Sequence, residues 1–317
     1  MLYDINLEKS NCGVGFITRK DGNQTHELLK LGHEALCRVP HRGGMASDGV
    51  GDGAGISVDL SLNYFEKLTR KKLKKGLFGV GNFFLPLDLK NKITAEKFVD
   101  TVLRNFELKV VLKRDLPVNE NYLTKIQRAS QLPIKQWIFL SEIERTEKEF
   151  ASAIYNALLE IEKSAFSLTS LEGLYPLSMS SKMQVFKGRL NSNEIIPFFR
   201  DLSDPEHKVK ILYFHTRFST NTKPQPAMAQ PFHLIAHNGE LNTDKKNRIS
   251  ENAIAQTKKR SVVSPFGQSD SCRLDQTIQS RLNEDRIDIV TAVVSMMPPA
   301  WENDTTLSQD VKSMFEY

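Results

Sequence analysis

Apolar positions along the chain follow two different spacings, and their mixture predicts the fold class. Helical spacing of apolar residues indicates helices over three segments, 28–39, 150–161 and 274–282. Short apolar runs bounded by turn residues indicate four strands, at 14–18, 76–86, 211–218 and 232–237. These segments lack the regular strand–helix alternation of a parallel α/β sheet. The pattern therefore predicts a mixed, layered α+β domain.

Capping and turn residues place the ends of several elements. Thr25 is expected to cap the first helix, and Pro40 is expected to end it. The tripeptide 269–271, Ser-Asp-Ser, is expected to cap the last of the three helices. Asn238-Gly239 is a strong turn signal directly after the strand predicted at 232–237.

The composition is that of a globular protein, with 317 residues, 40% of them hydrophobic and 26% charged. No apolar run approaches the roughly 18 to 20 residues that cross a bilayer, and the first residues lack the pattern of a secretory signal. We therefore expect a cytoplasmic protein with no membrane partner.

The net charge is +5, and much of the excess lies in the run 70–75, RKKLKK. Such a run either contacts an anionic partner such as nucleic acid or forms a solvated helix end. No aromatic residues are interleaved to stack on bases. The solvated helix end is therefore the favoured interpretation, and no nucleic-acid partner is expected.

Cysteine and histidine spacing predicts no metal site. The three cysteines, at 12, 37 and 272, form no CxxC pair, which argues against a zinc site, an iron–sulfur cluster or a disulfide framework. Cys37 lies one helical turn after His33, but two ligands do not make a site. His233 and His237 lack the glutamate of a zinc protease motif, so structural roles are expected for both.

The glycine-rich segment 41–56, HRGGMASDGVGDGAGI, contains a relaxed dinucleotide-binding pattern at 49–54. That pattern requires an apolar strand before it and a helix after it. Here the preceding residues are polar and the following ones are strand-like. We therefore expect a loop whose backbone passes close to another part of the chain, rather than a nucleotide site.

Cys12, in the stretch NCGVGF, is the remaining candidate for chemistry. A thiol nucleophile needs a nearby base and donors for the developing oxyanion, and no histidine is near it in sequence. An N-terminal nucleophile uses its own α-amine, with a pKa of about 7.7 to 8, as the base. At Cys12 this requires removal of residues 1–11. A buried packing thiol and a nucleophile both remain open on these grounds.

Six segments in order resemble the class II glutamine amidotransferase domain, and in particular the one in the large subunit of glutamate synthase. They are CGVGF (12–16), HRGGMASDGVGDGAGI (41–56), HTRFSTNT (215–222), AQPFHLIAHNGELNT (229–243), QSDS (268–271) and PPAWEND (298–304). The resemblance implies an α+β N-terminal-nucleophile hydrolase fold, with two stacked antiparallel sheets between helix layers in the order αββα. It also implies a propeptide over 1–11 and an amidotransferase domain over 12–317, which we expect to be incomplete at its C-terminus.

The resemblance also assigns catalytic roles. Cys12 would attack the side-chain amide of L-glutamine, with its own amine as the base. The Asn238 side chain and the Gly239 backbone N–H would hold the oxyanion. Ammonia would leave first, and water would then release glutamate.

Four further residues match positions of the family that bind substrate or shape the site. Arg217 would pair with the glutamine carboxylate, and Asp270 with its ammonium group. Arg42 and Asp52 are expected to organise the glycine-rich loop. Residues 223–228, KPQPAM, depart from the family, which usually has a bulky apolar residue and then a tryptophan there.

The resemblance implies that the ammonia passes to a synthase domain or subunit, which would hold FMN and an iron–sulfur cluster and make glutamate from 2-oxoglutarate. No cofactor is expected in this chain. Two alternatives stay open: an amidotransferase subunit serving a different acceptor, and a non-catalytic module of the same fold.

Overall fold

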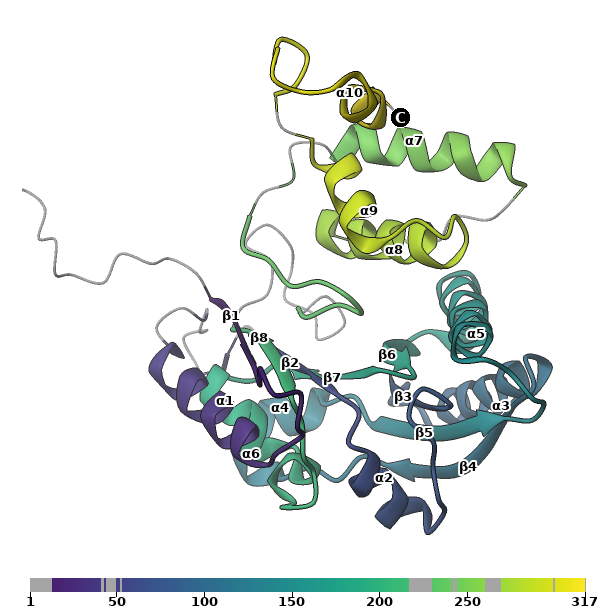
Figure 1. Cartoon of the computed structure of the whole chain (residues 1–317). Coiled ribbons are helices and arrows are strands. Elements are labelled where there is room, and N and C mark those ends of the chain that lie inside the picture. The colour runs from purple at the N-terminus through teal and green to yellow at the C-terminus, as the bar shows by residue number, and fades with distance from the viewer. Residues whose placement is uncertain are drawn as a thin grey trace, which may run out of the picture.

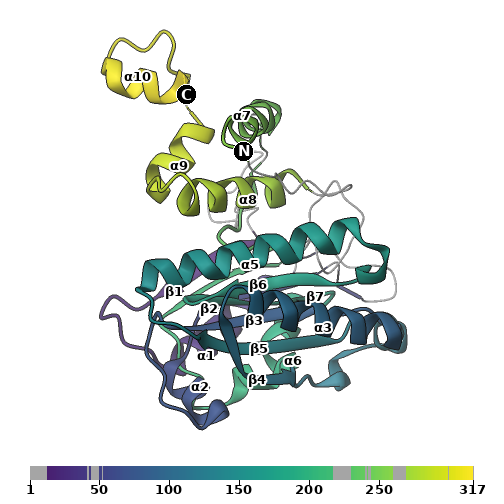
Figure 2. The same cartoon turned by 90° about the vertical axis from the view of Figure 1, so that its right-hand side faces the viewer.

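The computed structural model describes residues 13–40, 43, 50–51, 53–216, 230–239, 241, 244–259, 269–298 and 300–316. Within these ranges the chain forms two four-stranded antiparallel sheets with helices packed around them (Figures 1 and 2). The predicted α+β fold with two antiparallel sheets and helical layers is confirmed.

The first sheet carries the segments on which the candidate site is built. Its order is β1-β8-β2-β7, with β1 at Val14–Thr18, β8 at Ile211–His215, β2 at Ala54–Asp59 and β7 at Met183–Gly188. Ile56 pairs with Phe214 on one face, and Gly55 pairs with His215 on the other. The apolar face enters the main core, and the other face bears the polar residues used below.

The second sheet has the order β4-β5-β3-β6, with β4 at Leu108–Asp115, β5 at Ile134–Ser141, β3 at Phe78–Phe84 and β6 at Tyr175–Ser180. Residues 181–182 connect β6 directly to β7 and so link the two sheets. Phe84 and Leu177 of the second sheet share one core with Ile56 and Phe186 of the first. Burial of these side chains therefore holds the sheets together.

Helices cover both sheets. Their bounds are α1 Glu27–Arg38, α2 Leu62–Thr69, α3 Leu89–Asn105, α4 Lys125–Ser130, α5 Glu147–Ser167, α6 Ile195–Phe198, α7 Asp244–Thr257, α8 Asp270–Asn283, α9 Ile289–Met296 and α10 Gln309–Glu316. Helices α3 and α5 pack on the Trp137 and Phe139 face of the second sheet. Helices α7 to α10, green to yellow in Figure 1, form a group beyond α5 on one side of the sheets.

Most predicted elements are confirmed, including the strand at 14–18 and the helices containing 150–161 and 274–282. The predicted Thr25 cap is wrong, because α1 begins at Glu27 and His26 occupies the N-cap position. Thr25 instead forms a β-bridge with Val209, exchanging backbone hydrogen bonds of 2.9 and 3.1 Å. A backbone pairing with a residue far along the chain has replaced the local cap.

The basic run 70–75 follows the end of a helix, and its basic residues are exposed to solvent, as the sequence predicted. Helix α2 ends at Thr69, and Arg70 follows in a left-handed conformation with φ of 52°. Arg70 and the lysines of the run are exposed. In the described part of the chain, no helix combines the length and apolarity needed to cross a membrane.

His207 gives the fold a measurable dependence on pH. The ring is fully buried, stacks on Tyr64 at 4.5 Å, and contacts the Asp201 carbonyl and the Gln184 amide through its two nitrogens. Burial lowers the pKa of His207 to about 4, because the imidazolium would lose its hydration. The unfolded chain therefore binds a proton near pH 6.5, and the folded chain does not until about pH 4.

We expect this linkage to lower the free energy of unfolding by about 2 kcal/mol between pH 7.5 and pH 5.0. The stabilisation is fully present above pH 6.5 and is lost as the pH falls toward 4. Urea titrations at both pH values check this, with His207→Gln as the control. The variant should be less stable throughout but should lose less stability on acidification. An equal loss in both proteins would contradict the assignment.

Candidate active site

The two strand ends that flank the candidate site are hydrogen-bonded to each other. Strands β1 and β8 are antiparallel, with Val14 opposite His215. One step further, the Thr216 N–H donates to the Gly13 carbonyl at 2.8 Å. Gly13 follows Cys12 in the sequence and Thr216 precedes Arg217. The pairing of the sheet thus fixes the backbone immediately next to both residues.

The segment 230–239 is irregular, so the strand predicted at 232–237 is wrong. Three of its backbone N–H groups donate to one side chain and that of His237 donates to the Gln230 side chain, so neither set pairs with a neighbouring strand. The Asp275 carboxylate on α8 accepts from the backbone N–H groups of residues 233, 234 and 235, at 3.2, 2.7 and 3.0 Å. Asp275 is 1% exposed, and a buried carboxylate with several N–H donors is a strong, directional anchor. This anchor determines the path of the chain toward Asn238.

His215, at the end of β8, orients the Asn238 side chain. Its Nε2 lies 2.7 Å from Asn238 Oδ1 and 3.1 Å from the His237 carbonyl oxygen. A backbone carbonyl only accepts, so Nε2 carries the proton and donates. The Asn238 atom that faces Nε2 is then the amide oxygen, and the amide NH₂ group points away from His215. His215 is 3% exposed, so water does not compete for this bond.

The start of α8 joins the same network. Ser269 caps the helix by accepting from the Cys272 N–H at 3.1 Å, as the sequence predicted. Ser271 Oγ donates to Asp270 Oδ1 at 3.2 Å and lies 2.7 Å from His237 Nε2. With its proton directed to the carboxylate, this oxygen accepts from the His237 Nε2–H. Asp270 is therefore connected to the residue that precedes Asn238.

Buried charges lie beneath the 230–239 segment. Lys187, on β7, is 1% exposed, donates to the Pro231 carbonyl at 3.3 Å and lies 5.3 Å from the ring centres of Tyr175 and Phe232. Burial lowers its pKa to about 8, although Cys272, Asp275 and Glu162 oppose the shift. Burial raises the pKa of the Glu162 carboxyl. The segment thus lies against a buried lysine that has several acidic groups near it, Asp275 among them.

Two glycines confirm the close backbone approach predicted for the glycine-rich segment. A Cβ atom at Gly51 would lie 2.4 Å from the Leu190 carbonyl oxygen, and one at Gly55 would lie 2.7 Å from the Gln230 carbonyl oxygen. Strand β2 begins at Ala54, the last residue of the dinucleotide-binding pattern, where a dinucleotide site needs a helix. Gly55 therefore lets the 230–239 segment lie against the sheet.

Metal-ligand patterns in the sequence do not converge. Among the described residues, no group of three His, Cys, Asp or Glu side chains could hold a metal ion. His233 faces Asp275 and Gln279, whereas His237 faces Ser271. Cys37 is exposed, with its sulfur 3.7 Å from His33 Nε2. The two histidines of the H-x-x-x-H pattern thus have separate structural partners.

The structure describes three of the sequence-predicted site residues, Asn238, Gly239 and Asp270, and it connects Asn238 to Asp270 through the His237–Ser271 contact. The other four lie outside the described residues: Cys12, Arg42, Asp52 and Arg217.

Sequence reasoning missed three supporting residues: His215, Lys187 and Asp275. His215 had a usable signal, because it lies within the strand predicted at 211–218 and two positions before Arg217. Lys187 and Asp275 had no such signal in the sequence, because the backbone groups of segment 230–239 that they contact lie more than 35 positions away.

Comparisons with known proteins agree on one family. The family model described as "Glutamine amidotransferases class-II" matches residues 12–317. Similar proteins include "Glutamate synthase [NADH]" of Saccharomyces cerevisiae, 28% identical over all of this chain and 16% of that protein. "Glutamate synthase [NADPH] large chain" of Bacillus subtilis is 29% identical over all of this chain and 22% of its own length. "Ferredoxin-dependent glutamate synthase, chloroplastic" of Oryza sativa subsp. japonica is 30% identical, over 97% of this chain and 20% of that protein. The chain thus spans about a fifth of the curated relatives that it matches.

Replacing the anchor tests its importance. We expect Asp275→Ala to lower the free energy of unfolding by about 3 kcal/mol or more, because it leaves three backbone donors unpaired and removes one of the negative charges near Lys187. Asp115→Ala is the matched control, since the Asp115 side chain is 71% exposed and, among the residues that the structure describes, its one ion pair is with Lys135, at 3.4 Å. Urea unfolding of both variants checks this. Equal stability of the two variants would show that Asp275 is not an anchor.

Proposed function

Because this chain belongs to the class II glutamine amidotransferase family, we propose that it hydrolyses L-glutamine to glutamate and ammonia with Cys12 as the nucleophile. The domain would comprise residues 12–317, and residues 1–11 would be a propeptide whose removal frees the Cys12 amine. The observation that carries the proposal is the His215 bond, which holds the Asn238 amide oxygen and so leaves the amide NH₂ group pointing away from His215.

In the proposed reaction the Cys12 thiol attacks the side-chain amide carbon of glutamine. Its proton passes to the α-amine of Cys12, which is basic near neutral pH only when Asn11 is absent. The oxyanion accepts hydrogen bonds from the Asn238 NH₂ group and the Gly239 N–H. As the carbon–nitrogen bond breaks, the α-ammonium returns a proton to the leaving nitrogen, and ammonia departs. Water then attacks the thioester, which releases glutamate and restores the thiol.

His215 acts in this proposal as a positioning residue. An asparagine amide can stabilise an oxyanion only when its NH₂ group, and not its oxygen, faces the substrate. The two amide orientations differ by a rotation of the side chain that costs little unless a neighbour distinguishes them. His215 makes that distinction. Its Nε2 must carry a proton to donate to the His237 carbonyl, and this same N–H can only be accepted by the oxygen of the Asn238 amide.

Substrate recognition would use the two remaining charged residues. Arg217 would pair with the glutamine α-carboxylate and Asp270 with the α-ammonium group. The contacts that join Asp270 to His237 through Ser271 support this, because they connect the ammonium site to the segment bearing the oxyanion donors. Arg42 and Asp52 would organise the glycine-rich loop next to β2.

We further propose that the ammonia is passed to a synthase portion or subunit, where glutamate is made from 2-oxoglutarate. The support is the names of the relatives, which are glutamate synthases about five times longer than this chain. The FMN and the iron–sulfur cluster of the proposed reaction would belong to that synthase portion.

Intact-mass spectrometry tests the nucleophile. We expect the mature chain to begin at Cys12 and to gain one adduct there on treatment with 6-diazo-5-oxo-norleucine, a glutamine-like electrophile. Cys12→Ala should lose glutamine hydrolysis while its circular dichroism spectrum stays unchanged. Cys37→Ala, which alters an exposed thiol, is the matched control and should hydrolyse glutamine normally. Unchanged turnover in Cys12→Ala would sink the mechanism, and an intact Met1 without an adduct would favour an inactive module.

The positioning role of His215 is tested by two substitutions that differ in reach. In His215→Gln an amide N–H can replace Nε2–H, whereas His215→Asn is too short to reach Asn238. We expect kcat for glutamine to fall by about 100-fold in the Asn variant, as for loss of one oxyanion donor, and to recover substantially in the Gln variant. The KM should change little, because Arg217 and Asp270 are untouched. Equal kcat values for the two variants would refute the positioning role, and matched thermal midpoints would exclude a general loss of structure.

A further inference from the structure

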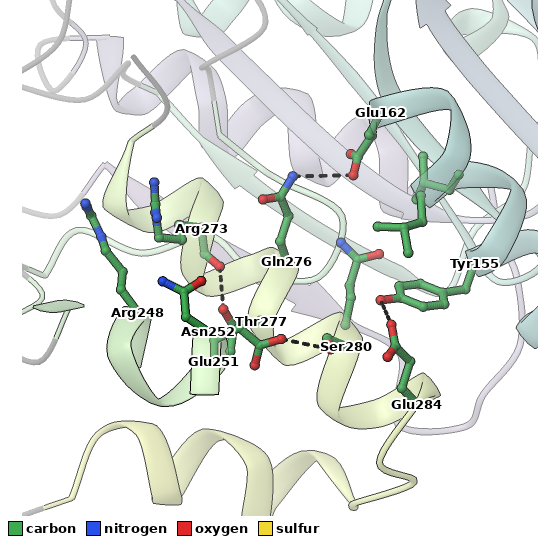
Figure 3. Close-up of a pocket in the computed structure, with 13 residues that line it drawn as sticks. Tyr155, Glu162, Arg248, Glu251, Asn252, Arg273, Gln276, Thr277, Ser280 and Glu284 are labelled. Atoms are coloured by element: carbon green, nitrogen blue, oxygen red, sulfur yellow. Dashed lines mark hydrogen bonds between the residues drawn. The ribbon is translucent and has the colours of Figure 1, made fainter. Parts of the chain in front are cut away.

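A pocket separate from the proposed catalytic residues lies between α5, α7 and α8 (Figure 3). Its lining includes neither His215, Asn238 nor Asp270. Arg248 of α7 and Arg273 of α8 line the same end of this pocket, and Figure 3 shows their side chains beside each other. Two arginines on neighbouring helices thus lie beside each other at one end of the pocket.

Both arginines have a buried donor without an acceptor. The Nε atoms of Arg248 and Arg273 are inaccessible to water and make no hydrogen bond. Arg248 pairs through Nη2 with Asp244 at 2.5 Å, whereas Arg273 makes no ion pair with any of the residues that the structure describes. Buried charged donors are costly to leave unpaired, and in folded proteins they usually meet a side chain, water or an ion.

The carboxylates that line the pocket have other partners. Glu251 lies 3.6 Å from Arg281 Nη2 and accepts from Ser280, and Glu284 accepts from the Tyr155 hydroxyl at 2.9 Å. Glu162 accepts from Gln276 at 3.3 Å, and burial raises its pKa. Burial and the nearby Arg248 charge lower the pKa of Arg273. The repulsion between the two arginines is therefore only partly compensated, by Asp244.

We propose that Arg248 and Arg273 form a binding site for a small oxyanion, a carboxylate or a phosphate group. The planar guanidinium fork matches two oxygens of either group, and two arginines on separate helices can bind one anion from two sides. Binding would replace repulsion between α7 and α8 with a shared ion pair. Helix α8 begins with Asp270 and carries the Asp275 anchor, so the ligand would stabilise the helix that supports the proposed active site.

The test measures binding and does not depend on glutamine hydrolysis. The thermal midpoint of the 317-residue chain is recorded against inorganic phosphate and, separately, glutarate, with chloride maintaining constant ionic strength. We expect a saturable rise with at least one probe, and a calorimetric titration should give one site per chain. Phosphate acting alone would identify a phosphate-bearing ligand, and glutarate acting alone a carboxylate.

Arg273→Gln should weaken binding at least about tenfold, since it removes the charge and the fork. Arg200→Gln is the matched control, because Arg200 is exposed on the short helix at 200–203, outside the pocket lining. Arg248→Gln provides a second test if Arg273→Gln is unstable. Equal stabilisation of all variants would reveal a general salt effect and overturn the proposal, as would the absence of saturable binding to either probe.

Discussion

Three consecutive backbone N–H groups donate to the Asp275 carboxylate, and the geometry of the candidate active site depends on this anchor. The segment 230–239 has no strand partner, so its donors need another acceptor. A carboxylate with more than one lone pair per oxygen can serve several donors at once, which a single carbonyl does poorly. Because α8 supplies that carboxylate, the position of the helix sets the position of Asn238.

The first sheet holds the segment 230–239 from the other side. β8 ends at His215, whose Nε2–H donates to both Asn238 and the His237 carbonyl. The bond between Thr216 and Gly13 keeps β1 in register with that strand end. The segment with the proposed oxyanion donors is therefore held between a sheet and a helix, each with its own hydrogen bonds. Rigid support of this kind is what preorganised electrostatic catalysis requires.

Burial determines how the charges beneath this segment behave. Lys187 and Asp275 are both 1% exposed and lie on different elements, β7 and α8. Desolvation lowers the pKa of Lys187 while Cys272, Asp275 and Glu162 raise it, so its charge depends on these neighbours. In the α7–α8 pocket, burial and the charge of Arg248 lower the pKa of Arg273, and the Nε atoms of both arginines have no acceptor. Helix α8 thus contributes Asp275 to the charge cluster around Lys187 and Arg273 to the arginine pair, whose repulsion a bound anion would reduce.

The sequence by itself determined the elements whose signals are local. Apolar spacing located α5 and α8, short apolar runs bounded by turn residues located β1 and β3, and Ser269 marked the start of α8. Six ordered motifs identified the family, which the comparison over residues 12–317 confirmed. Local spacing succeeds here because capping, helical periodicity and strand runs depend on residues a few positions apart.

Only the tertiary structure decided the features that depend on distant partners. The segment 232–237 has the composition of a strand, but its donors bond to Asp275, about 40 residues further along the chain. Thr25 looks like a cap, but it pairs with Val209. The tautomer of His215 and the proximity of Arg248 to Arg273 likewise follow from neighbours that the fold brings together. Hydrogen bonds and charge interactions act over a few ångströms in space, and sequence spacing does not reveal which distant residues will meet.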